Sequence, residues 1–404
     1  MKPFAQQLQR ALADRQAQDL YRIRRTLNSP QSTQIELDGK RLLNFCSNDY
    51  LGLANHPDLI RACKEGLDKY GVGSGASHLI VGHTQPHHAL EEELAAFTGR
   101  SRALLFSSGY MANVGTLGSL LGRQDRVFED RLNHASLLDG GMHSGARFKR
   151  FPHLDVTALA AMLPVGQDAH QTFIVSDGVF SMDGDCADLP ALVKLADSAG
   201  AQLMIDDAHG FGVLGSRGGG LVQCCQEAGV HIDEQNLPVL VGTLGKAFGT
   251  QGAFVAGTES LIENLIQFCR PYIYTTAMAP ALAAASRQSL RLLQQESWRR
   301  EKLQSLIKMF RTHCESLSYT LTQSMTPIQG LILGDAAMTL KASKLLEEQG
   351  IYVSAIRPPT VPQGSARLRI TFSAAHSEEQ VQALVQALET IRPQLVREHA
   401  HAAG

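Results

Sequence analysis

Short apolar segments alternate with longer helical segments through most of this 404-residue chain. Each apolar segment has the length of one buried strand, and the segments between are long enough for a helix. The expected strands are residues 103–106, 127–129, 173–176, 203–206, 239–243 and 253–256. Alternation of this kind predicts an α/β fold with a doubly wound, mostly parallel sheet. In such sheets ligands gather outside the carboxyl ends of the strands.

The pattern changes near residue 280, where two long helical stretches begin. The helices are expected at 279–296 and 299–315, and strands follow at 328–333, 352–356 and 368–372. A last helix opens at Ser377, with Gln380 three residues on, which is a capping-box pattern. These elements predict a smaller α+β domain.

The N-terminal segment has its own pattern. Apolar positions at roughly helical spacing predict an amphipathic helix over residues 4–25, and residues 35–45 predict a hairpin that turns at Asp38-Gly39. We therefore expect three parts: a helix and hairpin segment (1–45), a large α/β domain (46–285) and a small C-terminal α+β domain (286–404).

Composition excludes several classes of partner. Hydrophobic residues are 44% and charged residues 19%, and the net charge is −2, which is typical of a folded globular protein with no strong preference for nucleic acid or an anionic membrane. We see no signal peptide and no membrane span. The cysteines number 7, an odd count, and no CxxC occurs, which favours reduced thiols in the cytoplasm over disulfides or a zinc site.

Lys246 follows an apolar strand and is framed by Gly245 and Gly249, with Thr243 three residues before it. A lone lysine beside a turn is usually a solvated surface residue. At the end of a buried strand, however, an amine has a lowered pKa and suits Schiff-base chemistry. The Thr243 hydroxyl and nearby backbone amides can bind a phosphate.

A second cluster, Asp206 to Gly210, ends the strand about forty residues upstream. Taken alone, Asp206 or Asp207 can simply cap the next turn, and His209 can be a packed polar residue. Together with Lys246, these residues suit pyridoxal 5′-phosphate (PLP), which needs a covalent anchor and an anion to keep its ring nitrogen protonated. We therefore place Asp206 at that nitrogen.

Two more strand ends carry polar residues. The run 107–113 follows a strand and starts a helix, so Gly109 and Tyr110 can form part of a phosphate cup, although a plain capped helix is an equal alternative. His134 follows another strand, where an imidazole can lie flat against a cofactor ring or be purely structural.

Two other motifs do not lead to a function. Residues 210–215 match GxGxxG, but the segment does not read as strand, turn and helix in tight order, so we reject a dinucleotide site. His83, His87 and His88 are close in sequence, and His87 can lie near His83, but no carboxylate or cysteine has matching spacing, so we expect no metal site.

Taken together, the chain resembles the α-oxoamine synthase family of fold-type I PLP enzymes along nearly its whole length. The motifs that carry the resemblance are the runs 48–53, 73–77, 91–95, 177–184, 206–210 and 243–246. His78 departs from the pattern, because many members have arginine after the glycine-rich run.

The resemblance implies a role for each matched residue. Lys246 would anchor the cofactor and move protons, His134 would stack on its ring, Asp206 would pair with its nitrogen, and His209 would contact its hydroxyl. The other implied contacts are Gly109, Tyr110, Ser181 and Thr243 with the phosphate side; Thr275 or Thr276 of the partner subunit of a homodimer with the phosphate; Asn48 and Arg369 with the amino-acid carboxylate; and Arg22 and Thr360 with the acyl channel.

The run 355–362 and the following residues 366–370 are similar to the family branch that serves biotin biosynthesis. That branch implies decarboxylative condensation of L-alanine with a pimeloyl thioester, carried by coenzyme A or a carrier protein. Three alternatives stay open: the same chemistry with another pair, such as glycine and acetyl-CoA or a fatty acyl donor; a catalytically silent subunit; and a nicotinamide dehydrogenase.

Overall fold

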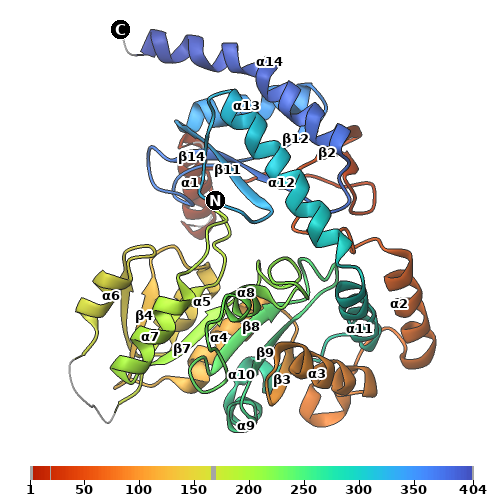
Figure 1. The fold of residues 1–404 in the computed structure, drawn as a ribbon, viewed down its shortest axis with the longest axis vertical. Helices are drawn as coiled ribbons and strands as arrows, with labels where there is room; N and C mark the ends of the chain where they lie inside the picture. The colour runs from red at the N-terminus through yellow and green to blue at the C-terminus, as the bar shows by residue number, and fades with distance from the viewer. Residues whose placement is uncertain (1–2, 19, 165–169, 403–404) are drawn as a thin grey trace.

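The computed structural model describes residues 3–18, 20–164 and 170–402, with side chains described as far as residue 395. Figure 1 shows two parts stacked along the long axis, with the large sheet in one and the C-terminal elements in the other. No helix in these described ranges is long and apolar enough to cross a membrane.

The larger part is built on a seven-stranded sheet in the order β3-β9-β8-β7-β6-β4-β5. Its strands are β3 (Arg102–Phe106), β4 (Arg126–Asp130), β5 (Arg147–Phe151), β6 (Thr172–Asp177), β7 (Gln202–Asp206), β8 (Val239–Thr243) and β9 (Ala253–Gly257). Only β9 runs against its neighbours, so the mostly parallel sheet is confirmed. The six expected strands are all present, and β5 is an additional edge strand.

Alternate side chains of each strand enter two different hydrophobic clusters. Leu105, Ile174 and Leu240 belong to one cluster, whereas Leu104 and Val175 belong to the other. Because successive strand residues point to opposite faces, both faces of the sheet are covered, as a parallel sheet requires.

Helices surround this sheet (Figure 1). They are α2 (Pro57–Tyr70), a π-helix η1 (His78–Gly82), α3 (Gln85–Thr98), α4 (Gly109–Leu120), α5 (Ala135–His143), α6 (Val156–Met162), α7 (Leu189–Ala199), α8 (Gly220–Glu227), α9 (Glu259–Phe268), α10 (Arg270–Ile273) and α11 (Pro280–Gln295). Ser108 caps α4 by accepting the amide of Met111, and His134 caps α5 by accepting that of Ser136. Both caps fix a helix N-terminus directly after a strand of the sheet.

The C-terminal part contains an antiparallel sheet in the order β10-β11-β14-β13. Its elements are α12 (Trp298–Ser316), β10 (Thr320–Leu321), β11 (Ile328–Gly334), α13 (Ala336–Glu348), β13 (Ser354–Ile356), β14 (Ala366–Thr371) and α14 (Glu378–Ala402). The capping box is confirmed, because Ser377 Oγ accepts the Gln380 amide at 3.2 Å and Gln380 Oε1 accepts the Ser377 amide at 3.1 Å. The strand expected at 352–356 is instead divided into β12 (Ile351–Tyr352) and β13, which belong to different sheets.

The N-terminal expectation was right for the hairpin and wrong for the length of the helix. Helix α1 covers Pro3–Ala17, and residues 20–26 are not helical. None of the side chains of α1 is buried, so no tertiary contact extends the helix. The hairpin of β1 (Gln34–Leu37) and β2 (Lys40–Asn44) turns at Asp38 and Gly39, both with positive φ, and β12 adds to it as a third strand.

Candidate active site

Three neighbouring parallel strands end at one cavity. β6, β7 and β8 finish at Asp177, Asp206 and Thr243, and Asp177 lies opposite Asp206 in the strand register. The cavity encloses about 560 Å³ and is lined by Gly109, Tyr110, Asn113, His134, Ser136, Asp177, Ser181, Asp206, Ala208, His209, Thr243 and Lys246. The structure therefore brings together the residues predicted to anchor the cofactor, contact its ring and surround its phosphate on this chain.

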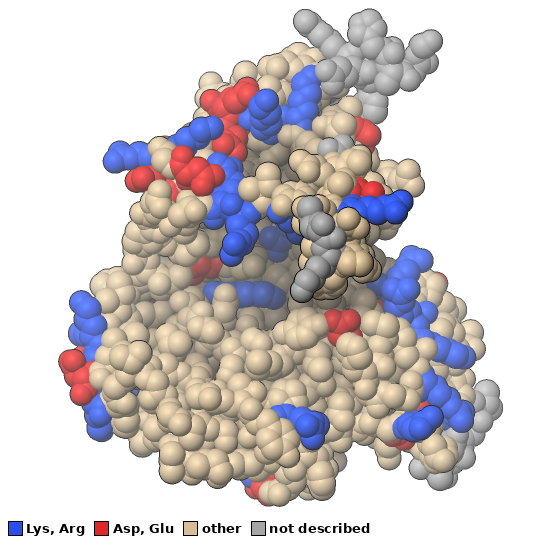
Figure 2. Space-filling model, turned by 180° about the vertical axis from the view of Figure 1, so that it is seen from behind, with Lys and Arg blue, Asp and Glu red and all other residues tan. Residues whose placement is uncertain are grey.

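The surface is hollowed between the two parts of the molecule (Figure 2). Lys and Arg side chains, drawn in blue, gather around this hollow and within it. An overall net charge of −2 thus conceals a locally basic region, which suits ligands that carry phosphate or carboxylate groups.

Lys246 lies on the turn that follows β8. The turn is held by a hydrogen bond from the Leu244 amide to Gly252 O at 2.9 Å and by another from the Gly249 amide to Lys246 O at 2.8 Å. Removal from water lowers the pKa of Lys246 to about 8, although the Asp206 carboxylate opposes this shift. A substantial fraction of the amine is therefore neutral, and nucleophilic, near physiological pH.

The Asp206 carboxylate is held on both oxygens. Its Oδ2 accepts a hydrogen bond from Asn113 Nδ2 at 2.6 Å, and its Oδ1 accepts one from the Ala208 amide at 3.0 Å. Sequence reasoning assigned no role to Asn113. Its spacing could have indicated a role, because Asn113 is four residues after Gly109 and both residues therefore lie on one face of α4.

His134 is connected to the end of β6. Its amide donates to Asp177 Oδ2 at 2.7 Å, and its Nδ1 lies 2.7 Å from Ser136 Oγ. Burial lowers the pKa of His134, so its ring is neutral. Burial and the adjacent Asp206 raise the pKa of Asp177 well above its usual value. The structural and functional interpretations of His134 are compatible, because it caps α5 and also lines the cavity.

His209 and the predicted carboxylate-binding pair belong to one polar network. His209 Nδ1 lies 2.7 Å from the hydroxyl of Tyr50, which donates to Asn48 Oδ1 at 3.2 Å. Arg369 Nη2 donates to the same Asn48 oxygen at 3.2 Å, and Arg369 Nε donates to Ser181 O at 2.6 Å. Burial lowers the pKa of His209 well below its usual value. Tyr50 was not identified from the sequence, although it lies two residues after Asn48.

The predicted phosphate side has the N-terminus of α4 at its centre. Gly109 and Tyr110 occupy the first turn, where backbone N–H groups have no acceptor within the helix. The Thr243 hydroxyl accepts the Gly245 amide at 3.2 Å and donates to Gly252 O at 3.1 Å, so it also stabilises the lysine turn.

Thr275 and Thr276 do not line this cavity within the described part of their own chain. Thr276 O accepts a hydrogen bond from Ser107 Oγ at 3.5 Å, and Thr276 forms an isolated bridge with Ser77. The contact of either threonine with the cofactor of a partner subunit stays a prediction.

A second cavity of about 1080 Å³ adjoins the first and shares His134 and Ser181 with it. Thr360 lines it, as the acyl-channel interpretation requires, together with Arg131 and Arg150. Arg22 is exposed between α1 and β1 and lines neither of these cavities within the described residues.

The rejected GxGxxG segment is not the start of a helix. Residues 210–215 form turns, and α8 begins only at Gly220. The Asp207 carboxylate accepts the amide of Leu221 at 2.6 Å and so occupies this helix N-terminus itself. The segment lacks the strand–turn–helix order that a dinucleotide site needs.

The residues of the first cavity fit PLP. An amine with a lowered pKa, a fixed carboxylate, two neutral imidazoles and an open helix N-terminus surround a single space. Asn113 lines this cavity, and its Oδ1 is buried and has no hydrogen-bond partner among the described residues. These groups match the anchor, ring and phosphate of that cofactor.

Comparisons with known proteins identify the family of this chain. The family described as "Aminotransferase class I and II" matches residues 40–388. The 8-amino-7-oxononanoate synthase of Pseudomonas putida KT2440 is 59% identical over 384 residues, which covers 95% of this chain and 97% of the relative.

Two solved structures are similar over most of the chain. The 8-amino-7-oxononanoate synthase of Francisella tularensis has a TM-score of 0.77 at 34% identity, covering 89% of this chain and 99% of its own. A serine palmitoyltransferase solved with PLP has a TM-score of 0.90 at 30% identity, covering 96% and 98%. This chain belongs to the aminotransferase class I and II family and, within it, to the α-oxoamine synthases.

Proposed function

We propose that this chain condenses L-alanine with a pimeloyl thioester to give 8-amino-7-oxononanoate, carbon dioxide and a free thiol, as a PLP-dependent acyltransferase of biotin biosynthesis. The observation that carries this proposal is the 59% identity, over 95% of the chain, to a relative that bears the name of this activity. The site supports it, because the proposed anchor, ring and acyl-channel residues Lys246, Asp206 and Thr360 line two adjoining cavities. Arg369 is hydrogen-bonded to Ser181, which lines both cavities.

PLP, when bound, supplies an electron sink that makes the α-carbon of the amino acid acidic. Lys246 would be its anchor, and Asp206 would pair with its ring nitrogen. Because Asn113 and Ala208 hold both oxygens of Asp206, this carboxylate keeps its orientation without reorganisation. The neutral His134 and His209 can contact the ring face and the ring hydroxyl without adding positive charge there.

Lys246 is also the proton carrier. With a pKa of about 8, its amine can accept the α-proton of alanine and later return a proton to the same carbon. A lysine with an ordinary pKa near 10.4 would be almost fully protonated at neutral pH and would be a poor base.

Arg369 and Asn48 are proposed to bind the alanine carboxylate. Arg369 is buried, and its Nε is committed to Ser181 O, so the guanidinium has a fixed plane. A fixed guanidinium presents parallel N–H groups that match a carboxylate. This binding orients the α-proton toward Lys246.

The acyl donor is proposed to enter through the second cavity, past Thr360. Arg131 and Arg150 line that cavity and can attract the negative groups of a pimeloyl thioester. Both coenzyme A and an acyl-carrier protein remain candidates for the carrier. Arg22 is proposed to join this channel from the exposed segment before β1.

We propose a cytoplasmic homodimer with the active site at the subunit interface. Exposed apolar side chains support it: Ile80 and Val81 are each 74% exposed and Tyr274 is 71% exposed. Ser77 and Thr276, which bridge one another, connect this apolar surface to the segment before α4. A second copy that covers this surface would bring its own Thr275 and Thr276 near the site.

The structural match to a serine palmitoyltransferase supports a second candidate, condensation of an amino acid with a fatty acyl thioester. One assay of the purified, PLP-loaded protein separates the two. L-Alanine, glycine and L-serine are each combined with acetyl-, pimeloyl- and palmitoyl-CoA, and released thiol and amino ketone are measured. We expect the largest kcat/KM for L-alanine with pimeloyl-CoA. A larger value for L-serine with palmitoyl-CoA, or for glycine with acetyl-CoA, would contradict the proposal.

A further inference from the structure

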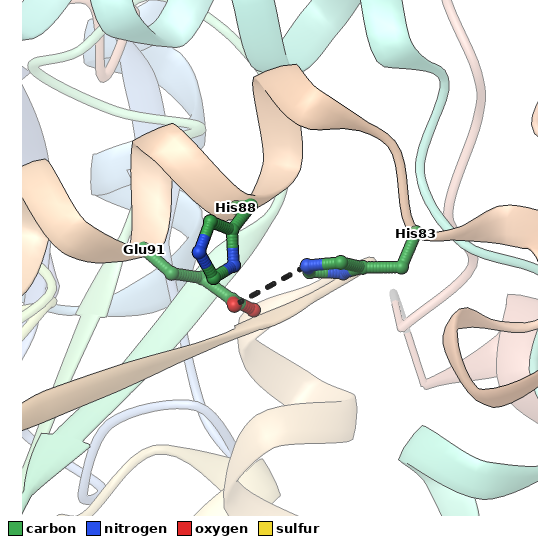
Figure 3. Close-up of side chains that lie close together, drawn as sticks. All are labelled: His83, His88 and Glu91. Carbon is green, nitrogen blue, oxygen red and sulfur yellow. Dashed lines mark ion pairs between the residues drawn. The ribbon is translucent and has the colours of Figure 1, made fainter.

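A group of potential metal ligands lies at the junction of η1 and α3. His83 follows η1, and His88 and Glu91 lie one turn apart on α3 (Figure 3). One ligand atom from each lies within 4.8 Å of the other two. The Glu91 carboxylate points toward both imidazoles, and its Oε2 is 3.9 Å from His83 Nε2.

The His83 ring is held from its other side. His83 Nδ1 lies 2.9 Å from His78 Nδ1, and the His78 ring is stacked on Tyr272 with ring centroids 5.0 Å apart. A hydrogen bond to one nitrogen of an imidazole fixes which nitrogen faces a ligand. His83 therefore presents Nε2 to the space beside Glu91. His78, the residue that departs from the family pattern, is the one that does this.

Glu91 is held in a similar way. Its Oε1 accepts the amide of Leu105 at 2.9 Å, and its side chain is only 13% exposed. The carboxylate is thus attached to the edge of the central sheet, and Oε2 is directed at His83. His88 is exposed, and its Nε2 lies 3.4 Å from Glu92 Oε1. The ring can therefore rotate between the carboxylates of Glu92 and Glu91.

The expectation of no carboxylate with matching spacing was wrong. His87 does lie near His83, as the sequence suggested, with ring centroids 5.8 Å apart. Both ring nitrogens of His87 are already in use: Nδ1 contacts the amide and hydroxyl of Thr84, and Nε2 bonds Met278 O at 2.8 Å. His87 caps α3, whereas its neighbour His88 shares a face with Glu91, three residues on.

We propose that His83, His88 and Glu91 bind a divalent transition-metal ion of the zinc type. Two imidazole nitrogens and one carboxylate oxygen are ligands that zinc accepts, with water in a fourth position. Bond lengths of about 2.0 to 2.1 Å place neighbouring tetrahedral ligands about 3.4 Å apart. The 3.9 Å between His83 and Glu91 is close to this value, and rotation of the exposed His88 completes the set.

The ion would connect η1 to α3. None of its three ligands lines the cavity around Lys246 within the described residues, so the site is structural and separate from the reaction. Because the ion binds the folded state, it stabilises that state in proportion to its concentration relative to Kd.

The test is calorimetric titration of tag-free, chelator-treated holoenzyme with ZnCl2. The wild-type protein is compared with two ligand variants. His88→Ala removes an exposed imidazole, and Glu91→Gln removes the carboxylate charge but keeps an oxygen that can accept the Leu105 amide. Matched controls are Glu92→Gln, on the next residue of α3, and His231→Ala, a distant and exposed histidine beside Asp233. The melting temperature of each protein is measured with and without ZnCl2.

We expect one equivalent to bind the wild-type protein and both controls, and to raise their melting temperature. His88→Ala and Glu91→Gln should each weaken binding by about tenfold or more, since even outer-sphere changes have effects of that size. The proposal would be overturned by no saturable binding to the wild-type protein, or by binding to both α3 ligand variants that equals wild-type binding. Loss in Glu92→Gln with full binding in Glu91→Gln would assign the ion to another pair and would also refute it.

Discussion

Arg369→Lys separates the geometry of the proposed carboxylate site from its charge. Arg369 donates from Nε to Ser181 O at 2.6 Å and from Nη2 to Asn48 Oδ1 at 3.2 Å, which fixes the guanidinium beside Ser181, a residue that lines both cavities. Lysine preserves the positive charge but has a single nitrogen. That nitrogen cannot satisfy Ser181 O and also make a two-point contact with a substrate carboxylate.

The magnitude follows from the bond that is lost. A hydrogen bond to a charged group contributes about 1.5 to 3 kcal/mol. Since about 1.4 kcal/mol corresponds to a factor of ten, KM for L-alanine should rise roughly 10- to 100-fold. We expect a smaller change in kcat and little change in KM for the acyl thioester, because the variant alters only the amino-acid contact.

The assay is steady-state thiol release with each substrate varied in turn. Arg367→Lys is the matched control, because Arg367 is also buried on β14, two residues away, and pairs with Asp183 and with Ser365 O. It tests the effect of a buried lysine on the same strand without a proposed carboxylate contact. An unchanged KM for L-alanine in Arg369→Lys, or an equal rise in Arg367→Lys, would refute the reasoning.

Three further substitutions are informative: two in the proposed cofactor site, at Lys246 and Asp206, and one at His153, which forms ion pairs outside that site. Lys246→Ala should lower kcat by about 10²-fold or more, because the proton carrier is lost; full condensation activity in the PLP-loaded variant would exclude Lys246 as the base. Asp206→Ala should lower kcat by about a hundredfold or more while the protein stays folded, as judged by circular dichroism, and an unchanged kcat would remove Asp206 from the ring nitrogen. His153→Gln tests pH dependence: burial opposes protonation of His153, but hydrogen bonds to Asp130 and Asp185 outweigh it and raise its pKa to about 9. This stabilisation is complete below the unfolded pKa of about 6.5 and is lost as pH rises through about 9, so the difference in melting temperature between wild type and variant should narrow from pH 6.5 to pH 10; a constant difference would contradict it.

The central sheet was predictable because its strands are buried on both faces. Residues 173–176 and 203–206 read as continuous apolar runs, and β6 and β7 extend them by one or two residues at the ends. β5 was missed because Arg147–Phe151 is a charged edge strand that has no such run. The helix over 4–25 was overextended, since helical spacing alone does not show whether a partner surface exists.

The residues at the strand ends were deduced from the sequence, and their partners were not. Asp206 ends an apolar strand, and Lys246 and His134 each follow one; parallel topology brings the carboxyl ends of neighbouring strands together. Asn113 holds Asp206, and Tyr50 meets His209 across 159 positions of the chain, through contacts that no local pattern contains.

By itself, the sequence determined the fold class, the family and the side chains that line the cavity around Lys246, because hydrophobic periodicity and local motifs are properties of short segments. Only the tertiary structure decided which groups orient those side chains and how far their pKa values move, because both depend on distances and burial between remote segments. Contacts between remote segments also explain the arrangement of His83, His88 and Glu91. Spacing correctly suggested that His87 lies beside His83, but the fold commits the ring nitrogens of His87 to Thr84 and Met278. Only the fold shows that His88 and Glu91 also lie close to His83 with ligand atoms available.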